Sequence, residues 1–174
     1  MSTLHVENLK GLSSGGNANK IIVPSGQTLV PSVGQVIHTE RVVSTDDITV
    51  TTSGTTYTDV WTVNYTPKLT ASSVFFQYNA LIRNFRDGAY DARSNLRVLH
   101  NGSAVYTVTD IGEYDYGNSG SWQKWQFSDA TSYSNTNGSQ ITWKLQLARS
   151  GATDTRFGEA ATTSGTMIIT EVVS

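Results

Sequence analysis

Gln140-Ile141-Thr142-Trp143-Lys144-Leu145-Gln146-Leu147 alternates polar and apolar residues without a break. Successive side chains of a β-strand point to opposite faces, so strict alternation predicts a strand with one face against a core. The residues expected to face inward are Ile141, Trp143, Leu145 and Leu147, and those expected outward are Thr142, Lys144 and Gln146.

Residues 74–83 show the same two-residue period. Phe76, Tyr78, Ala80 and Ile82 share one parity, and Gln77 and Asn79 fall on the other. Weaker alternation predicts further strands in residues 36–43, 48–52, 57–65, 122–127 and 167–173. Because no window of helical length keeps an apolar stripe at a period of 3.6 residues, we expect no helix longer than about two turns.

Turn signals separate these segments. Asn101-Gly102 lies between two apolar runs, and this pair favours a type I′ hairpin turn, which needs a positive φ at both positions. Further turns are predicted at Ser53-Gly54, Asp87-Gly88, Asn137-Gly138, Ser150-Gly151 and Ser164-Gly165. About eight short strands without helices predict an all-β fold, an antiparallel β-sandwich with a jelly-roll-like arrangement.

The composition agrees with this fold and excludes several functions. Of the 174 residues about a quarter are Ser or Thr, and 15% are charged, with a formal net charge of -2. Without a basic field, nucleic acid is a poor partner, and with no Cys there are no disulfides or thiol chemistry. No signal peptide or membrane-spanning segment is visible, so we expect no membrane insertion.

The chain divides by composition near residue 35. Residues 1–35 are interrupted by Gly, Ser and Pro and contain short apolar pieces at 4–9 and 21–23, which cannot form a core of their own. Such a segment is either a disordered tail or an extended arm that becomes ordered against another subunit. We expect residues 1–35 to be an extended N-terminal arm that lies on a partner chain, and residues 36–174 to be the β-sandwich domain.

Motifs along nearly the whole chain resemble a known group of proteins. The matching pieces are the opening 1–9, the segments 19–29 and 34–37, the Thr-rich hairpin 49–57, the Asp-Val strand 58–63, Thr66-Pro67-Lys68, the Ser-Ser-Val strand 72–76 and the Ile-Thr-Glu ending 168–172. In these features the chain is similar to small virion proteins of tailed phages that infect aquatic bacteria.

This resemblance implies a homotrimeric appendage of the particle, either a tail fibre, a head fibre or a capsid decoration protein. The N-terminal arm would then bind other virion proteins of the capsid or tail, and the β-domain would project from the particle surface. The weakly charged, Ser- and Thr-rich surface expected of the domain agrees with such exposure, and so does an arm whose apolar residues need a partner.

An aromatic cluster is the candidate binding region. Aromatic rings stack on sugar rings, so this region is where we would expect contact with a host surface glycan, although core or subunit packing is the commoner role of such residues. Its members are Tyr114, Tyr116, Trp122, Trp125 and Tyr133. Trp122 and Trp125 have opposite parity, so one faces the core and the other faces outward or into a subunit interface.

Other residue sets give little support for catalysis or cofactors. Asp110, Glu113 and Asp115 lie close together, and two carboxylates at a fixed separation are what glycoside hydrolysis requires. They lie, however, in a stretch that resembles a loop, where acids usually face water. The histidines His5, His38 and His100 lack the spacing of paired metal ligands. The arginines Arg83, Arg86, Arg93 and Arg97 are interleaved with acids and aromatics, which favours local ion pairing or subunit contacts.

We therefore predict a non-enzymatic structural protein of a virion, with no catalytic residue, metal or cofactor. The alternative is a free carbohydrate-binding module, which would share the sandwich and the aromatic loop but would be a monomer without need of an arm.

Overall fold

A computed structural model describes residues 32–86, 92–113, 121–152, 154–160 and 162–174. The chain divides into two units, Met1–Ser32 and Val33–Ser174, and the description below concerns the second. Its strands are β1 (Val36–Ser44), β2 (Ile48–Val50), β3 (Thr58–Tyr65), β4 (Ser72–Arg86), β5 (Ala92–His100), β6 (Ser103–Glu113), β7 (Ser121–Asn135), β8 (Ile141–Arg149), β9 (Asp154–Phe157) and β10 (Gly165–Val173). The described residues contain no helix, so the predicted all-β class is confirmed.

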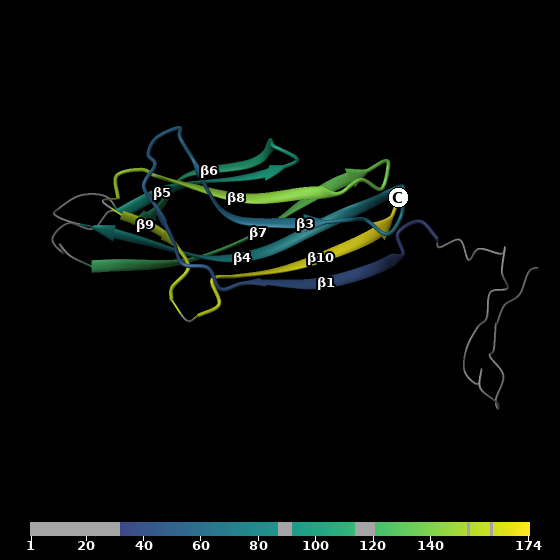
Figure 1. Cartoon of the computed structure of the whole chain (residues 1–174), viewed down its shortest axis with the longest axis horizontal. Helices are drawn as coiled ribbons and strands as arrows, with labels where there is room; N and C mark the ends of the chain where they lie inside the picture. The colour runs from purple at the N-terminus through teal and green to yellow at the C-terminus, as the bar shows by residue number, and fades with distance from the viewer. Residues whose placement is uncertain (1–31, 87–91, 114–120, 153, 161) are drawn as a thin grey trace, which may run out of the picture. The chain divides into compact units, whose positions relative to one another are not determined.

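The strands form two antiparallel sheets, which lie as two layers in Figure 1. One sheet has the order β3-β8-β5-β6. In the other, β7 runs along one side of the long strand β4, while β10 and β9 follow one another along its opposite side. β1 pairs with β10 and β2 pairs with β9, so this sheet consists of four strand positions, two of which are interrupted.

These pairings make the domain a jelly roll. The first strand position pairs with the last (β1 with β10), the second with the seventh (β3 with β8), the third with the sixth (β4 with β7) and the fourth with the fifth (β5 with β6). This nested order is that of a long antiparallel ribbon folded over itself into two facing sheets. The jelly-roll-like sandwich predicted from the sequence is thus observed.

The core lies between the two sheets and is built by the predicted alternation. Ile141, Trp143, Leu145 and Leu147 of β8 are fully buried, as are Phe76, Ala80 and Ile82 of β4, with Tyr78 3% exposed. Trp61 of β3 packs edge-on against Trp143 at 5.3 Å and stacks near Phe157 at 6.0 Å between ring centroids. Both strands predicted in detail therefore have the expected inner face.

The predicted hairpin at Asn101-Gly102 is confirmed. β5 and β6 pair up to His100 and Ser103, which leaves these two residues as the whole loop. Asn101 has φ of 49° and Gly102 has φ of 83°. Positive φ at both positions is what the type I′ turn requires.

Three details differ from the sequence-based expectations. Gly165 was expected in a turn but begins β10, where a Cβ atom would lie 2.7 Å from the Trp61 ring. The stretch around Asp110 was expected to be a loop, but β6 continues through it to Glu113, with Asp110 at a positive φ of 57°. Gln146 does face outward, but it is 8% exposed because Asp59 and Arg97 bond to it from neighbouring strands.

Candidate functional site

The predicted aromatic cluster is divided between the two faces of β7. Tyr114 and Tyr116 lie outside the described residues. Trp125 and Tyr133 pack against the core, and the Tyr133 hydroxyl accepts a hydrogen bond of 3.1 Å from Asn101. Trp122 lies on the outer face of the sheet, so the described members of the cluster do not share one surface.

Trp122 is engaged by side chains from β4 and β9. Its ring lies 5.1 Å from the Phe85 ring, and the guanidinium carbons of Arg83 and Arg156 lie 5.1 Å and 4.7 Å from a Trp122 ring centroid. A cation near an aromatic face is attracted by its quadrupole. In the described arrangement Trp122 therefore holds two arginines.

Three cations form a row across the outer face of the sheet. Arg83 is the direct neighbour of Lys124 on β7 and of Arg156 on β9. Like charges directly opposite one another are unfavourable in a sheet unless they are neutralised. Trp122 supplies part of that compensation, and carboxylates supply the rest.

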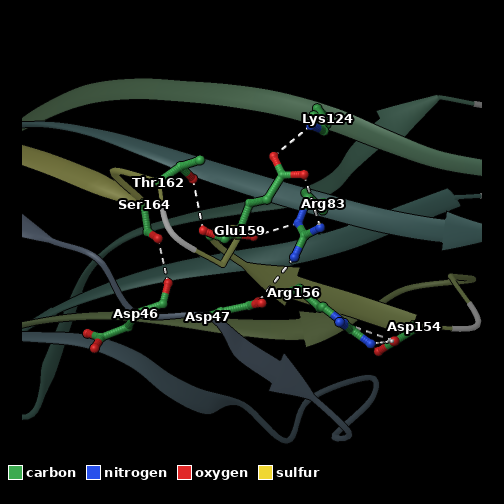
Figure 2. Close-up of polar contacts among 10 residues, drawn as sticks. Asp46, Asp47, Arg83, Lys124, Asp154, Arg156, Glu159, Thr162 and Ser164 are labelled. Carbon is green, nitrogen blue, oxygen red and sulfur yellow. Dashed lines mark hydrogen bonds and ion pairs between the residues drawn. The ribbon is translucent and has the colours of Figure 1, made fainter.

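Of the carboxylates around this row in Figure 2, Asp47 and Glu159 come from loops, while Asp154 lies on β9 and pairs with Arg156 at 3.2 Å. Arg83 lies 3.1 Å from Asp47 and 3.7 Å from Glu159, and Lys124 lies 2.6 Å from Glu159. The hydrogen bond from Lys124 lowers the pKa of Glu159, which keeps this carboxyl ionised at neutral pH. The cation row with its carboxylates thus joins the β1–β2 and β9–β10 connections to the sheet.

Backbone contacts complete this attachment. The Arg83 Nε donates to the carbonyl of Gly158, and the Ser164 hydroxyl donates to the carbonyl of Asp46. Arg83 is 8% exposed, and burial of a cation is tolerated where its donors are used in this way. Arg83 and Arg93 do form ion pairs, with Asp47 and Asp110, but both partners lie on other segments of the chain; the acids interleaved with the arginines, Asp87 and Asp91, lie outside the described residues.

Glu171 forms a second polar cluster, which the sequence reasoning missed. It is fully buried and accepts hydrogen bonds from the Tyr65 hydroxyl (2.6 Å), the Ser72 hydroxyl (2.7 Å) and the backbone N–H groups of Lys68 (2.8 Å) and Leu69 (3.1 Å). Burial by itself raises the pKa of this carboxyl, but these hydrogen bonds outweigh it and lower the pKa below 4.5. The available signal was parity, since Glu171 shares the inner face with Met167 and Ile169.

One half of the outer surface of the sheet that contains β4 carries almost no charge, unlike the half that holds the cation row. β1, β10, β4 and β7 contribute four aligned outward residues each, and Arg41 alone among them is charged. We name this surface the low-charge face. Its residues are Val36, Thr39, Arg41, Val43, Thr166, Ile168, Thr170, Val172, Ser73, Phe75, Gln77, Asn79, Ser128, Ala130, Ser132 and Ser134.

The low-charge face is hollowed at its centre. A shallow concavity of about 570 Å³ lies over β10, β4 and β7 and is lined by Gln77, Tyr78, Asn79, Ser128, Asp129, Ala130, Thr166 and Ile168. Its lining offers mainly amides, hydroxyls and aliphatic carbons, together with one acid, Asp129, whose carboxylate accepts a hydrogen bond from the Ala130 N–H.

The carboxylates are occupied elsewhere. Every carboxylate whose side chain the structure describes has a hydrogen-bond or ion-pair partner. The described residues hold no group of three or more His, Cys, Asp or Glu side chains placed to bind a metal. Of the predicted acidic trio, Asp110 bonds to Ser150 and pairs with Arg93, and Asp115 lies outside the described residues.

His100 is a buried core residue. Its Nε2 lies 3.0 Å from the Thr131 hydroxyl and its ring packs 5.3 Å from that of Phe76. Burial lowers the pKa of the imidazole from its ordinary value of 6.5, which favours the neutral ring.

Across the described part of the chain, no helix is long and apolar enough to span a membrane.

Comparison with known proteins gives similarity of fold at a low level. No protein-family model matches the chain, and no curated protein matches it significantly. The similar solved structures include the VP2 subviral particle of infectious bursal disease virus, with 12% identity, a TM-score of 0.41, and coverage of 86% of this chain and 36% of the viral one.

Two more of these structures have similarly low sequence identities and TM-scores. The infectious bursal disease virus Gt strain structure has 12% identity, a TM-score of 0.42, and coverage of 97% of this chain and 41% of that one. Dimeric latent PorU from Porphyromonas gingivalis has 9% identity, a TM-score of 0.43, and coverage of 91% and 15%. The chain thus spans less than half of each of these proteins, and similarity at this level identifies neither a family nor a function.

Proposed function

We propose that this chain is a non-enzymatic structural protein of a tailed-phage virion. In this proposal it forms a homotrimeric fibre or capsid decoration, which residues 1–35 anchor to the capsid or tail. The β-domain, residues 36–174, stands on the particle surface, where it serves for display or for attachment to the host, with a host surface glycan as one ligand.

The observation that carries the proposal is how the domain uses its ionisable groups. In a typical active site, acids and bases converge in a cleft, often with perturbed pKa values. Here the described carboxylates bind to other parts of the fold. Arg83 and Glu171 hold loops to strands, and Asp59 pairs with Lys144 across two neighbouring strands. The concavity described above lies open on a sheet face instead of between catalytic groups.

The fold and the N-terminal segment support the same proposal. A jelly roll is used by viral capsid proteins and by lectins alike, so the fold by itself leaves the choice to the site and the arm. Apolar residues in 1–35 need a surface to cover them, and a second copy or a neighbouring virion protein provides one. A free sugar-binding module has no use for such a segment.

Deletion of residues 1–35 tests this role of the arm. The shortened chain should keep a β-rich circular dichroism spectrum, because the strands of the jelly roll begin at Val36. It should lose its self-association in size-exclusion chromatography and its binding to purified phage particles. An oligomer of unchanged mass after the deletion would show that the arm does not support assembly.

A further inference from the structure

The low-charge face is incompletely covered in a single copy of the domain. Phe75 and Val43 are each 41% exposed and Val36 is 53% exposed. The outer face of the other sheet, by contrast, carries the ion pair between Lys144 and Asp59. Exposed aromatic and aliphatic groups in a patch of low charge are typical of a protein contact surface.

The size of the face limits what can occupy it. Four strands about 4.8 Å apart and four aligned rows give a surface of about 25 Å by 19 Å, or roughly 500 Å². Two such faces pressed together would bury about 1,000 Å², which is at the lower limit of a specific interface. A contact of sheet against sheet is therefore a weak basis for a stable oligomer.

An extended segment fits the face better. Its concavity presents the Gln77 and Asn79 amides and the Ser128 hydroxyl, and Asn79 donates to Ser128 over 2.9 Å. Amides and hydroxyls satisfy the N–H and C=O groups of an extended backbone, while Ile168 and Phe75 give apolar contact for its side chains. The occupant expected from this chemistry is an uncharged peptide with several aliphatic residues.

The chain itself contains such a segment outside the described residues. Residues 21–31 read Ile-Ile-Val-Pro-Ser-Gly-Gln-Thr-Leu-Val-Pro and have no charged side chain. Fully extended, eleven residues span about 36 Å, which exceeds the length of the face. The described chain that follows this segment starts at the rim of the domain, where Gly34 and Gln35 hydrogen-bond to Val173 beside the first row of the face.

We propose that the low-charge face of each copy binds residues 21–31 of a neighbouring copy. This inference rests on the proposed trimer and adds the surface that holds it together. Because Gly34 and Gln35 lie at the rim where the face begins, three copies with these rims around a threefold axis could each supply the segment to the next copy. Such a heterologous contact forms a closed ring when three copies are related by the threefold axis.

Cysteine cross-linking tests the arrangement directly, because the chain has no Cys of its own. The full-length chain with both Val23→Cys and Gln77→Cys is purified, oxidised mildly and run on a denaturing gel without reductant. We expect covalent dimers and trimers that collapse to monomer on reduction. The matched control is Val23→Cys with Thr62→Cys, which places the second thiol on the exposed outer side of β3 and should give monomer.

Two results of the cross-linking would overturn the inference. An internally linked monomer, which runs faster than the reduced chain, would mean that the segment covers its own domain. An absence of linked species while the chain remains a trimer by light scattering would mean that the trimer uses another surface. A wild-type chain that is monomeric would instead contradict the proposed function itself, so the two failures are distinguishable.

A second variant tests the face without a cross-link. Phe75→Glu puts a charge at an exposed position of the face. It should raise at least tenfold the protein concentration at which half of the full-length chain is dissociated from trimer to monomer. Thr62→Glu, the same change on the exposed side of the other sheet, should leave the dissociation unchanged. Equal behaviour of the two variants, both folded by circular dichroism, would contradict the inference.

Discussion

Glu171 binds together three neighbouring segments of the domain. Its carboxylate joins β10 to β3, to the start of β4 and to the backbone of the connection between them. A buried carboxylate is costly unless donors surround it, and here four donors do so. Removing its charge leaves those donors without a full partner.

Glu171→Gln should therefore lower the free energy of unfolding by about 1–3 kcal/mol at pH 7. Because the folded-state pKa lies below 4.5, the carboxylate's contribution is complete above about pH 4.5 and is lost as the pH falls through the folded-state value. The gap in stability between wild type and variant should thus narrow from pH 7 to pH 3 in urea unfolding. Glu40→Gln, at an exposed site, is the control, and a gap that is constant with pH would contradict this role.

Gly165 is fixed by contact with the Trp61 ring. A Cβ atom there would lie 2.7 Å from a ring carbon in the core, so the ring or the strand would have to move. Gly165→Ala should destabilise the domain by about 1–3 kcal/mol, measured by thermal unfolding. Thr166→Ala, the next residue on β10, should change stability far less, and the cost of Gly165→Ala should shrink in a Trp61→Phe background. Equal effects of the two alanine variants would show that the ring accommodates the methyl group.

At the scale of an element, the β5–β6 hairpin depends on its two-residue turn. Gly102→Val places a β-branched residue at φ of 83°, a region that L-residues with branched side chains avoid. We expect a loss of about 1–2 kcal/mol, seen as a lower melting temperature. Thr107→Val, on the exposed side of β6, tests whether the added methyl groups matter by themselves. A melting temperature unchanged by Gly102→Val would count against the turn as the determinant of this pairing.

The strands and turns also show which features could be predicted from neighbouring residues in the sequence. Alternation predicted the inner faces of β4 and β8 because a period of two is a local property, and Asn-Gly predicted the hairpin for the same reason. Local sequence could not predict that Arg83 would be buried, since its partners Asp47 and Gly158 come from segments far along the chain. The Ser164-Gly165 pair predicted a turn, but Gly165 begins a strand. Its contact with Trp61 could not be predicted because it depends on how the two sheets pack.

At the scale of the whole molecule, the low-charge face could not be predicted either. It arises from the register of four strands that are distant in the sequence, and no window of the chain contains more than one of them. Of the predicted aromatic cluster, only Trp122, Trp125 and Tyr133 are described, and they lie on two faces of β7. The predicted contact with a glycan stays a prediction that depends on Tyr114 and Tyr116 as well.

The central claim is that the chain works as a trimer assembled through its N-terminal arm. The most direct measurement is the solution mass of the full-length protein by light scattering after size exclusion, over a range of concentrations. The account predicts a species with the mass of three chains of 18.9 kDa each. A single species of 18.9 kDa at all concentrations would contradict it.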